Sequence, residues 1–159
     1  MSIYKATIDD AKLISSIISK ANKDIANKFS LDINNCPKHP SFYTTQWVLS
    51  DMQRQEEYFL YKKDKEVVAC VAFENPREEV GYLNRLSVIP SYRHKGIGEE
   101  LVKYIFEYAK SKNIKRLSIG IIAEHQVLKQ WYIKLGFKES NKKSFPHLPF
   151  EVLYMNIYF

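Results

Sequence analysis

Apolar residues recur every three to four positions in several stretches of the chain, and this period predicts amphipathic helices. The first helix is expected to begin after Thr7, whose hydroxyl can cap it, and a shorter helix is expected at about 44–54. Two later helices are expected at 97–112 and 126–135. The stripe that the first helix should bury consists of Leu13, Ile14, Ile17, Ile18 and Ala21.

Runs rich in β-branched and aromatic residues predict strands between these helices. Residues 58–62 and 66–73, separated by a short charged turn, are typical of a β-hairpin, and a second turn is expected at Asn75-Pro76. The other expected elements are a loop at 31–41 and strands at 82–89, 116–122 and 150–158. The element order α-α-β-β-β-α-β-α-β-β predicts an α/β (α+β) fold with a mixed sheet.

A glycine-containing segment joins the strand at 82–89 to the helix at 97–112, and it reads Arg93-His94-Lys95-Gly96-Ile97-Gly98. The first backbone N–H groups of a helix have no intrahelical acceptor and carry partial positive charge, so anions bind there. Gly96 and Gly98 allow the backbone to approach a ligand closely, and Arg93 and Lys95 add positive charge. The segment therefore predicts a pyrophosphate-binding loop, with a purely structural turn as the alternative.

Two familiar phosphate-binding motifs do not fit this loop. A P-loop requires Lys and then Ser or Thr after its last glycine, whereas Glu99 follows Gly98. A dinucleotide-binding fingerprint requires a third glycine three positions after Gly98, where Leu101 stands. Nucleoside triphosphate and dinucleotide chemistry are therefore disfavoured.

Three segments of the chain resemble segments of the GNAT N-acetyltransferase superfamily. They are the loop itself, the preceding Leu86-Ser87-Val88-Ile89-Pro90, and the downstream Leu128-Lys129-Gln130-Trp131-Tyr132-Ile133-Lys134-Leu135-Gly136-Phe137. The resemblance covers residues 82–137 and implies one domain over residues 1–159. It implies a GNAT-like mixed, strongly twisted sheet of about six to seven strands flanked by about four helices. Acetyl-CoA would bind where the strands at 82–89 and 116–122 splay apart. The implied cofactor-binding residues are Leu86, Ser87, Val88, Arg93, His94, Lys95, Gly96, Ile97, Gly98 and His125.

In this superfamily an amine attacks the thioester carbonyl directly. The transfer needs a neutral amine, stabilisation of the carbonyl oxygen and a proton for the departing thiolate. The resemblance implies that the Val88 N–H polarises the carbonyl and that Tyr132 is the general acid. The residues alone leave an alternative, because Tyr132 shares a helical face with Leu128 and Leu135 and can be a plain core residue.

Two residues depart from the superfamily pattern. Asn84 stands where many members have a glutamate, and an amide cannot act as a base. Proton removal would then fall to another carboxylate, to ordered water, or to an amine whose own pKa is low. His125 stands where the final helix usually begins with Asn, so it can contact the cofactor, act as a base, or simply start the helix.

The resemblance places the acceptor site near two proline- and aromatic-containing stretches, 36–43 and 145–150, each with one histidine. Both suit a partly enclosed pocket, although both can also be stiffened loops packed on the core. The acceptor-binding residues are expected to be Asn84, His39 and His147. The acceptor is expected to be a small-molecule amine, with a peptide amine as the alternative.

Composition narrows the remaining classes. The chain has 159 residues, 45% of them hydrophobic, and its net charge of +6 comes from dispersed basic residues, so nucleic acid is not an expected partner. Cys36 and Cys70 lack zinc-site or disulfide spacing, and no metal is expected. With neither a signal-peptide core nor a membrane-length apolar run, a cytoplasmic location without membrane contact is expected, and a homodimer stays open.

These observations predict an acetyl-CoA-dependent N-acetyltransferase that uses acetyl-CoA as co-substrate. A non-catalytic acyl-CoA-binding sensor is the alternative, and Asn84 is the main argument for it. A basic nucleic-acid-binding domain is a third, remote option.

Overall fold

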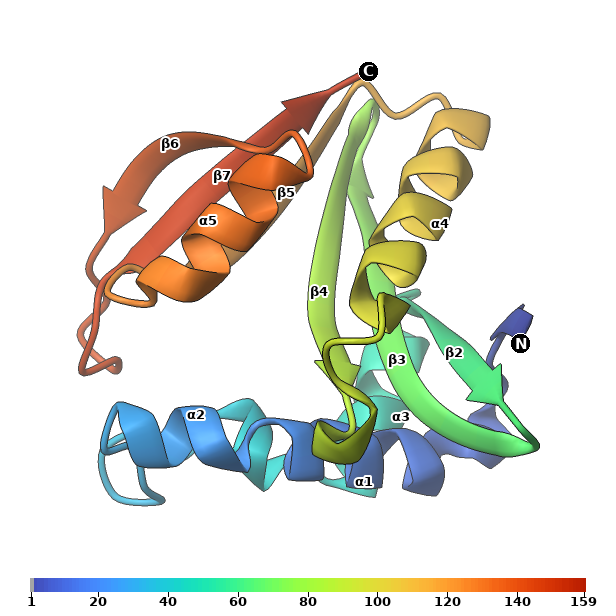
Figure 1. Cartoon of the computed structure of the whole chain (residues 1–159). Helices are drawn as coiled ribbons and strands as arrows, with labels where there is room; N and C mark the ends of the chain where they lie inside the picture. The colour runs from blue at the N-terminus through green and yellow to red at the C-terminus, as the bar shows by residue number, and fades with distance from the viewer. Residues whose placement is uncertain (1) are drawn as a thin grey trace.

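The computed structural model describes residues 2–159, in which a seven-stranded mixed sheet forms the centre of the molecule (Figure 1). Its strand order is β1-β2-β3-β4-β5-β7-β6, and only the β4–β5 pair is parallel. The strands are β1 (Ser2–Lys5), β2 (Glu57–Lys63), β3 (Glu66–Arg77), β4 (Val80–Val88), β5 (Arg116–Ile122), β6 (Lys138–Lys143) and β7 (Val152–Tyr158).

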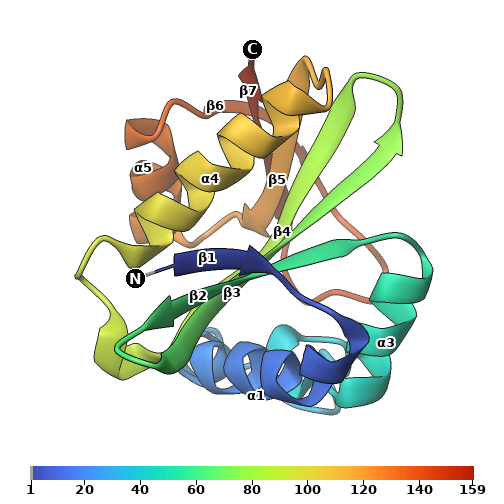
Figure 2. The ribbon, with the colours of Figure 1, turned by 90° about the vertical axis from the view of Figure 1, so that its right-hand side faces the viewer.

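Helices cover both faces of this sheet. The turned view shows α1 and α3 on one face of the β2–β4 half and α4 on the other, with α5 next to the β5–β7 half (Figure 2). The α-helices are α1 (Ala11–Ala21), α2 (Lys23–Lys28), α3 (Thr45–Gln53), α4 (Ile97–Ser111) and α5 (Gln126–Lys134). The twisted mixed sheet flanked by helices confirms the predicted fold class.

The alternation of side chains along β3 divides the core into two layers. Val71 and Phe73 pack with the buried face of α4, whereas Cys70 and Ala72 pack with Ile14 and Ile18 of α1. These side chains are at most 1% exposed. Burial of each large apolar side chain contributes about 1.5–3 kcal/mol, so both helices are held against the sheet mainly by their apolar stripes.

The β4 and β5 strands form a V-shaped gap (Figure 1). They pair only at Val80↔Arg116, Gly81↔Leu117 and Tyr82↔Ser118, although both strands continue beyond these residues. Their later residues therefore leave backbone groups unpaired between the two strands. The predicted divergence is confirmed.

A β-bulge in β4 lies beside this gap. Asn84 pairs with Ala72 and Ser87 with Cys70, so β4 has one more residue than β3 over this stretch. Arg85 lies at the bulge with φ 51°. This left-handed conformation costs a non-glycine residue about 1 kcal/mol or more. The bulge changes the alternation of side chains between the two faces of the sheet, and it turns the side chains of Asn84 and Arg85 towards polar partners.

Most predicted elements are confirmed, but β1, β6 and α2 were not assigned to residues, although the predicted order does end in two strands. The strands β1 and β6 lie at the two edges of the sheet; β1 has only four residues, and β6 has no apolar residue to alternate with its polar ones. The helix α2 has only six residues and follows Asn22, whose side-chain amide donates to the Ile18 carbonyl and ends α1.

Three local predictions are corrected. Thr7 precedes a 3-10 turn at Ile8–Asp10 before α1 begins at Ala11. Leu13 is 40% exposed, because it projects about 100° around the helix from Ile14 and misses the sheet. The β3–β4 turn lies at residues 78–79 rather than at Asn75-Pro76. The Asn75 side-chain amide donates hydrogen bonds to the Arg77 and Val80 carbonyls, and these bonds keep the two strands together up to the turn.

Candidate functional site

The inner edge of β4 presents free backbone groups to the gap. The Ile89 N–H donates to the Val68 carbonyl of β3, and backbone direction alternates along a strand, so the Val88 and Leu86 N–H groups point away from β3. They face the side on which β5 has already diverged. Ser87 differs, because its N–H side faces β3 and its buried hydroxyl contacts the Asn22 amide at 3.3 Å.

The predicted phosphate loop opens α4 as expected. Gly96 is the N-cap at φ 83°, a conformation that favours glycine, and an added Cβ there would meet no atom within 4 Å. The first backbone N–H bonded within α4 is that of Glu100, to the Gly96 carbonyl at 3.0 Å, so the preceding donors at Ile97 and Gly98 remain available. His94 and Lys95 are exposed beside them. The loop therefore offers backbone donors and positive charge to an anion.

Arg93 has a different position from the one expected for a phosphate ligand. Its guanidinium donates to Asp24 at 2.6 Å and to the Ala21 carbonyl, and its Nε reaches the Val88 carbonyl at 3.4 Å. The hydrogen bond from Arg93 is the main cause that lowers the pKa of Asp24. The side chain of Arg93 thus ties α1 and α2 to the loop, which leaves its role in cofactor binding a prediction.

A cavity of about 330 Å³ lies between the diverging strands, α2 and α5, and we name it the transfer cavity. It brings together predicted residues from three separate parts of the chain, with apolar walls from β5. The predicted residues that line it are His39, Asn84, Leu86, His125 and Tyr132. His147 does not line this cavity; it is exposed in a loop next to Phe145 and stays a prediction.

Tyr132 lies in the wall of the transfer cavity. It is 5% exposed, and its hydroxyl makes no hydrogen bond with any residue in the described part of the chain. Burial raises the pKa of this phenol, which keeps it protonated at neutral pH. A protonated hydroxyl at a cavity wall can donate a proton to a ligand atom, although the ring also packs on Phe137 of the core.

The two predicted histidines in this cavity have structural contacts as well. His125 caps α5, where its Nδ1 accepts the Leu128 N–H at 3.4 Å. His39 accepts the Ser41 N–H at 3.1 Å and lies 2.8 Å from the Ser41 hydroxyl. Burial is the main cause that lowers the pKa of each imidazole, so both favour the neutral form near neutral pH.

Asn84 lies between two carboxylates. Its Nδ2 donates to Glu56 Oε2 at 3.1 Å and to Glu74 Oε1 at 3.3 Å. These acceptors fix the orientation of the amide, because only the NH₂ end can face carboxylates, and so the amide oxygen is left to accept from a ligand. Asn84 also lines the transfer cavity, so its amide oxygen is available to a hydrogen-bond donor there.

A buried polar cluster supports the bulge behind Asn84. The Arg85 guanidinium forms an ion pair with Glu56, lies 3.5 Å from Asp51 and donates to the Tyr58 hydroxyl at 2.8 Å. Asp51 also accepts from Tyr58 at 2.7 Å and from Tyr43 at 2.5 Å. Burial raises the pKa of Tyr43 to about 12, so this hydroxyl remains a donor. The cluster holds Arg85 in its left-handed conformation.

The sequence did not predict Glu56, Glu74 or Arg85 as site residues, although it carries one signal for the bulge. Leu83 and Leu86 are separated by the consecutive polar pair Asn84-Arg85, which interrupts strict alternation in the middle of a strand. Such a phase change is typical of a bulge. No comparable signal identifies Glu56 or Glu74, because their proximity to Asn84 depends on the pairing of β2, β3 and β4.

The comparisons with known proteins agree with this geometry. The sequence model of the acetyltransferase (GNAT) family matches residues 22–137. An amino-acid acetyltransferase of Pseudomonas aeruginosa is 29% identical over 92 residues, and one of Photorhabdus laumondii is 27% identical over 100 residues. These matches cover 57% and 62% of this chain, but only 20% and 21% of those proteins, so the chain spans about a fifth of their length.

Solved structures of similar fold cover nearly the whole chain. The ribosomal-protein-S18-alanine N-acetyltransferase of Escherichia coli has a TM-score of 0.78 at 14% identity, with 99% of this chain and 92% of that one covered. A putative acetyltransferase, yncA of Salmonella typhimurium, solved with its cofactor acetyl-CoA, has a TM-score of 0.71 at 16% identity, with 99% and 93% covered. At these identities the likeness shows a shared fold.

Proposed function

The chain belongs to the acetyltransferase (GNAT) family, and on that premise we propose that it transfers an acetyl group from acetyl-CoA to a primary amine. The observation that carries this proposal is the convergence of the free β4 edge, Asn84 and Tyr132 on the transfer cavity. The acetyl-CoA in the Salmonella structure of similar fold supports the choice of co-substrate. A small-molecule amine is the proposed acceptor.

The residues present fit acetyl-CoA. The gap between β4 and β5 offers unpaired N–H groups of Leu86 and Val88 to the amide-containing arm, and the N-terminal turn of α4 offers donors to the pyrophosphate. A Cβ on Gly98 would lie 3.4 Å from the Trp131 ring, so this turn packs closely against α5. Acetyl-CoA supplies the activated thioester carbonyl.

The polar groups in the transfer cavity account for the proton movements. We assign the Asn84 amide oxygen the task of accepting a hydrogen bond from the acceptor amine and orienting its lone pair. The Val88 N–H is assigned to the carbonyl oxygen, where negative charge develops. When the N–C bond forms and the C–S bond breaks, the Tyr132 hydroxyl gives its proton to the sulfur.

The proton of the amine needs a separate acceptor, and we assign it to Glu74 acting through water beside Asn84. Glu56 is nearer to Asn84 but is already neutralised by Arg85 and is 5% exposed. Glu74 makes no ion pair with the part of the chain that the structure describes, and it is only half-buried. It is therefore the carboxylate at Asn84 that is free to take up a proton.

A screen of primary amines with acetyl-CoA tests this proposal. Free thiol release and the mass of the acetylated product are measured together, with acetyl-CoA alone as the background. Transfer to at least one amine above this background is the expected result. Binding of acetyl-CoA without transfer to any amine would instead support the acyl-CoA-binding sensor, which Asn84 in the place of a family glutamate favours.

A further inference from the structure

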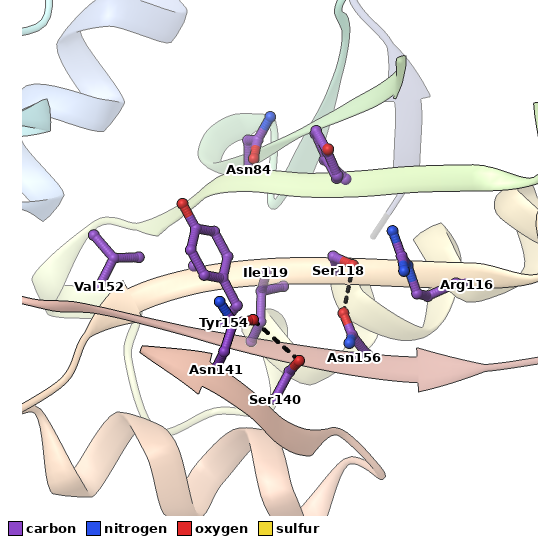
Figure 3. Close-up of a pocket in the computed structure, with 11 residues that line it drawn as sticks. Asn84, Arg116, Ser118, Ile119, Ser140, Asn141, Val152, Tyr154 and Asn156 are labelled. Carbon is purple, nitrogen blue, oxygen red and sulfur yellow. Dashed lines mark hydrogen bonds between the residues drawn. The ribbon is translucent and has the colours of Figure 1, made fainter. Parts of the chain in front are cut away.

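A second cavity of about 420 Å³ lies on the outer face of the β4–β5–β7–β6 half-sheet, and we name it the outer cavity (Figure 3). Leu117 and Ile119 of β5 face the α4-side core, so the alternate residues Arg116 and Ser118 point to the opposite face. Asn84 lines both this cavity and the transfer cavity. The outer cavity therefore adjoins the place assigned to the acceptor amine, with Asn84 between them.

Several hydrogen-bond donors line this cavity. Asn156 Oδ1 accepts from the Ser118 hydroxyl at 2.5 Å and Asn141 Oδ1 accepts from the Ser140 hydroxyl at 3.2 Å, so the NH₂ group of each amide remains free to donate (Figure 3). Arg116 supplies a guanidinium. The lining residues include no aspartate or glutamate. Such a surface complements an anion rather than a cation.

Arg116 itself has no protein partner for its charge. Its Nε is buried without a hydrogen bond, and no carboxylate within residues 2–159 forms an ion pair with it. A buried donor without a partner costs about 1–3 kcal/mol. A carboxylate in the cavity cannot reach this enclosed atom, but its two oxygens match the fork of the two terminal nitrogens of the guanidinium.

We propose that the outer cavity is an acceptor subsite in which Arg116 binds a carboxylate of the molecule that is acetylated. Arg116 is paired with Val80, and Asn84 lies four residues further along β4, which is about 13 Å at about 3.3 Å per residue. The arginine side chain shortens this span. The acceptor is thus an extended amine whose carboxylate lies on the order of 10 Å from the amine, the length of a tripeptide.

This assignment rests on the proposed acetyl transfer, and trialanine and trialanine amide provide matched probes. The parent protein should acetylate the free acid with a kcat/KM at least about 10-fold above that of the amide, because only the acid pairs with Arg116. Arg116→Gln should remove this preference by lowering kcat/KM for the acid alone. Lys115→Gln removes the same charge from the exposed neighbouring residue and should retain the preference.

Equal rates for acid and amide in the parent, or an equal loss for both in Arg116→Gln, would overturn the subsite. Arg116→Lys serves if Arg116→Gln does not fold; it keeps the charge without the fork and should retain only part of the preference. A stronger competitive effect of inorganic phosphate than of acetate, at matched ionic strength, would overturn the choice of carboxylate.

Binding without turnover separates this proposal from the proposed function. N-acetyl-trialanine and its amide are titrated calorimetrically into the parent and into Arg116→Gln. Tighter binding of the acid that depends on Arg116 establishes the subsite even if no amine is acetylated. Acetylation of amines together with equal binding of acid and amide rejects the subsite and leaves the proposed function intact.

Discussion

The side-chain nitrogen of Asn84 donates to the buried carboxylate of Glu56 over 3.1 Å. This bond fixes the amide with its oxygen free, so a residue that cannot act as a base can still position an amine. Glu56 is in turn paired with Arg85 at the bulge. The backbone distortion beside the gap and the orientation of Asn84 are therefore held by the same carboxylate.

Asn84→Asp should destabilise the protein by about 1–3 kcal/mol at pH 7.5, because a third carboxylate would face Glu56 and Glu74 without a donor between them. Urea unfolding monitored by circular dichroism measures the change. Asn141→Asp, on the exposed strand β6, is the matched control and should alter stability far less. A stable Asn84→Asp protein would show that the amide donates to neither carboxylate.

Glu74→Gln should lower kcat for ordinary alkylamines by about 10²-fold near pH 7, because the amine would lose its proton acceptor. Aromatic amines, which are already neutral at that pH, should lose much less activity. Glu78→Gln, an exposed change in the same hairpin, is the control. An equal loss with both kinds of amine would place Glu74 outside the proton path.

Tyr132→Phe should lower kcat by roughly 10²-fold while the acetyl-CoA dissociation constant stays nearly constant. The hydroxyl has no hydrogen-bond partner in residues 2–159, so its removal should leave the melting temperature close to that of the parent. Tyr104→Phe makes the same change on α4, outside the transfer cavity. Parent-like turnover in a stable Tyr132→Phe protein would make Tyr132 a core residue.

Gly96→Ala should raise the acetyl-CoA dissociation constant about 10-fold and cost about 1 kcal/mol of stability. The new methyl group would enter the open space next to the α4 donors, where phosphate is expected, at a backbone φ of 83°. Calorimetric titration and thermal unfolding separate the two effects. Gly98 is a poorer test, since a substitution there also meets Trp131 at 3.4 Å. Unchanged affinity would assign Gly96 to the turn alone.

Acidification should destabilise the protein through His39. Burial lowers the folded-state pKa of this imidazole below its ordinary value of 6.5, so its contribution to stability is present above pH 6.5. The contribution is lost as the pH falls through the lowered pKa, because a protonated Nδ1 can no longer accept the Ser41 N–H. His39→Gln should flatten the fall in unfolding free energy between about pH 7.5 and pH 5.

The matched control for this pH series is His147→Gln, which removes an exposed imidazole from a loop. It should retain the parent slope. If His39→Gln and the parent lose stability in parallel on acidification, proton binding at His39 is not linked to folding.

The order of elements and the glycine turn that opens α4 could be predicted because they depend on local periodicity and on glycine chemistry. Phosphate binding at this turn stays a prediction. The convergence of His39, Asn84, His125 and Tyr132 was predicted only through the resemblance, since these residues are far apart in the chain. The position of Arg93 was not foreseen because its partner, Asp24, lies 69 residues away. Arg116 was missed for a related reason: an isolated arginine at the start of a strand is ordinary, and only the assembled sheet shows that it lacks a partner.

The short β4–β5 pairing also has a mechanical consequence. Three residue pairs, together with backbone hydrogen bonds from Lys115 and Arg116 to the Glu79 carbonyl, join the two halves of the sheet at one end of β4 and β5. Beyond this end the contact between the halves is side-chain packing, which has no preferred direction. A change in the spacing of β4 and β5 beyond this end would therefore break no backbone hydrogen bond between the two strands. A molecule that hydrogen-bonds to the free edge of β4 and packs against β5 would replace the missing pairing between the two strands. The size of that molecule would then set the distance between β4 and β5.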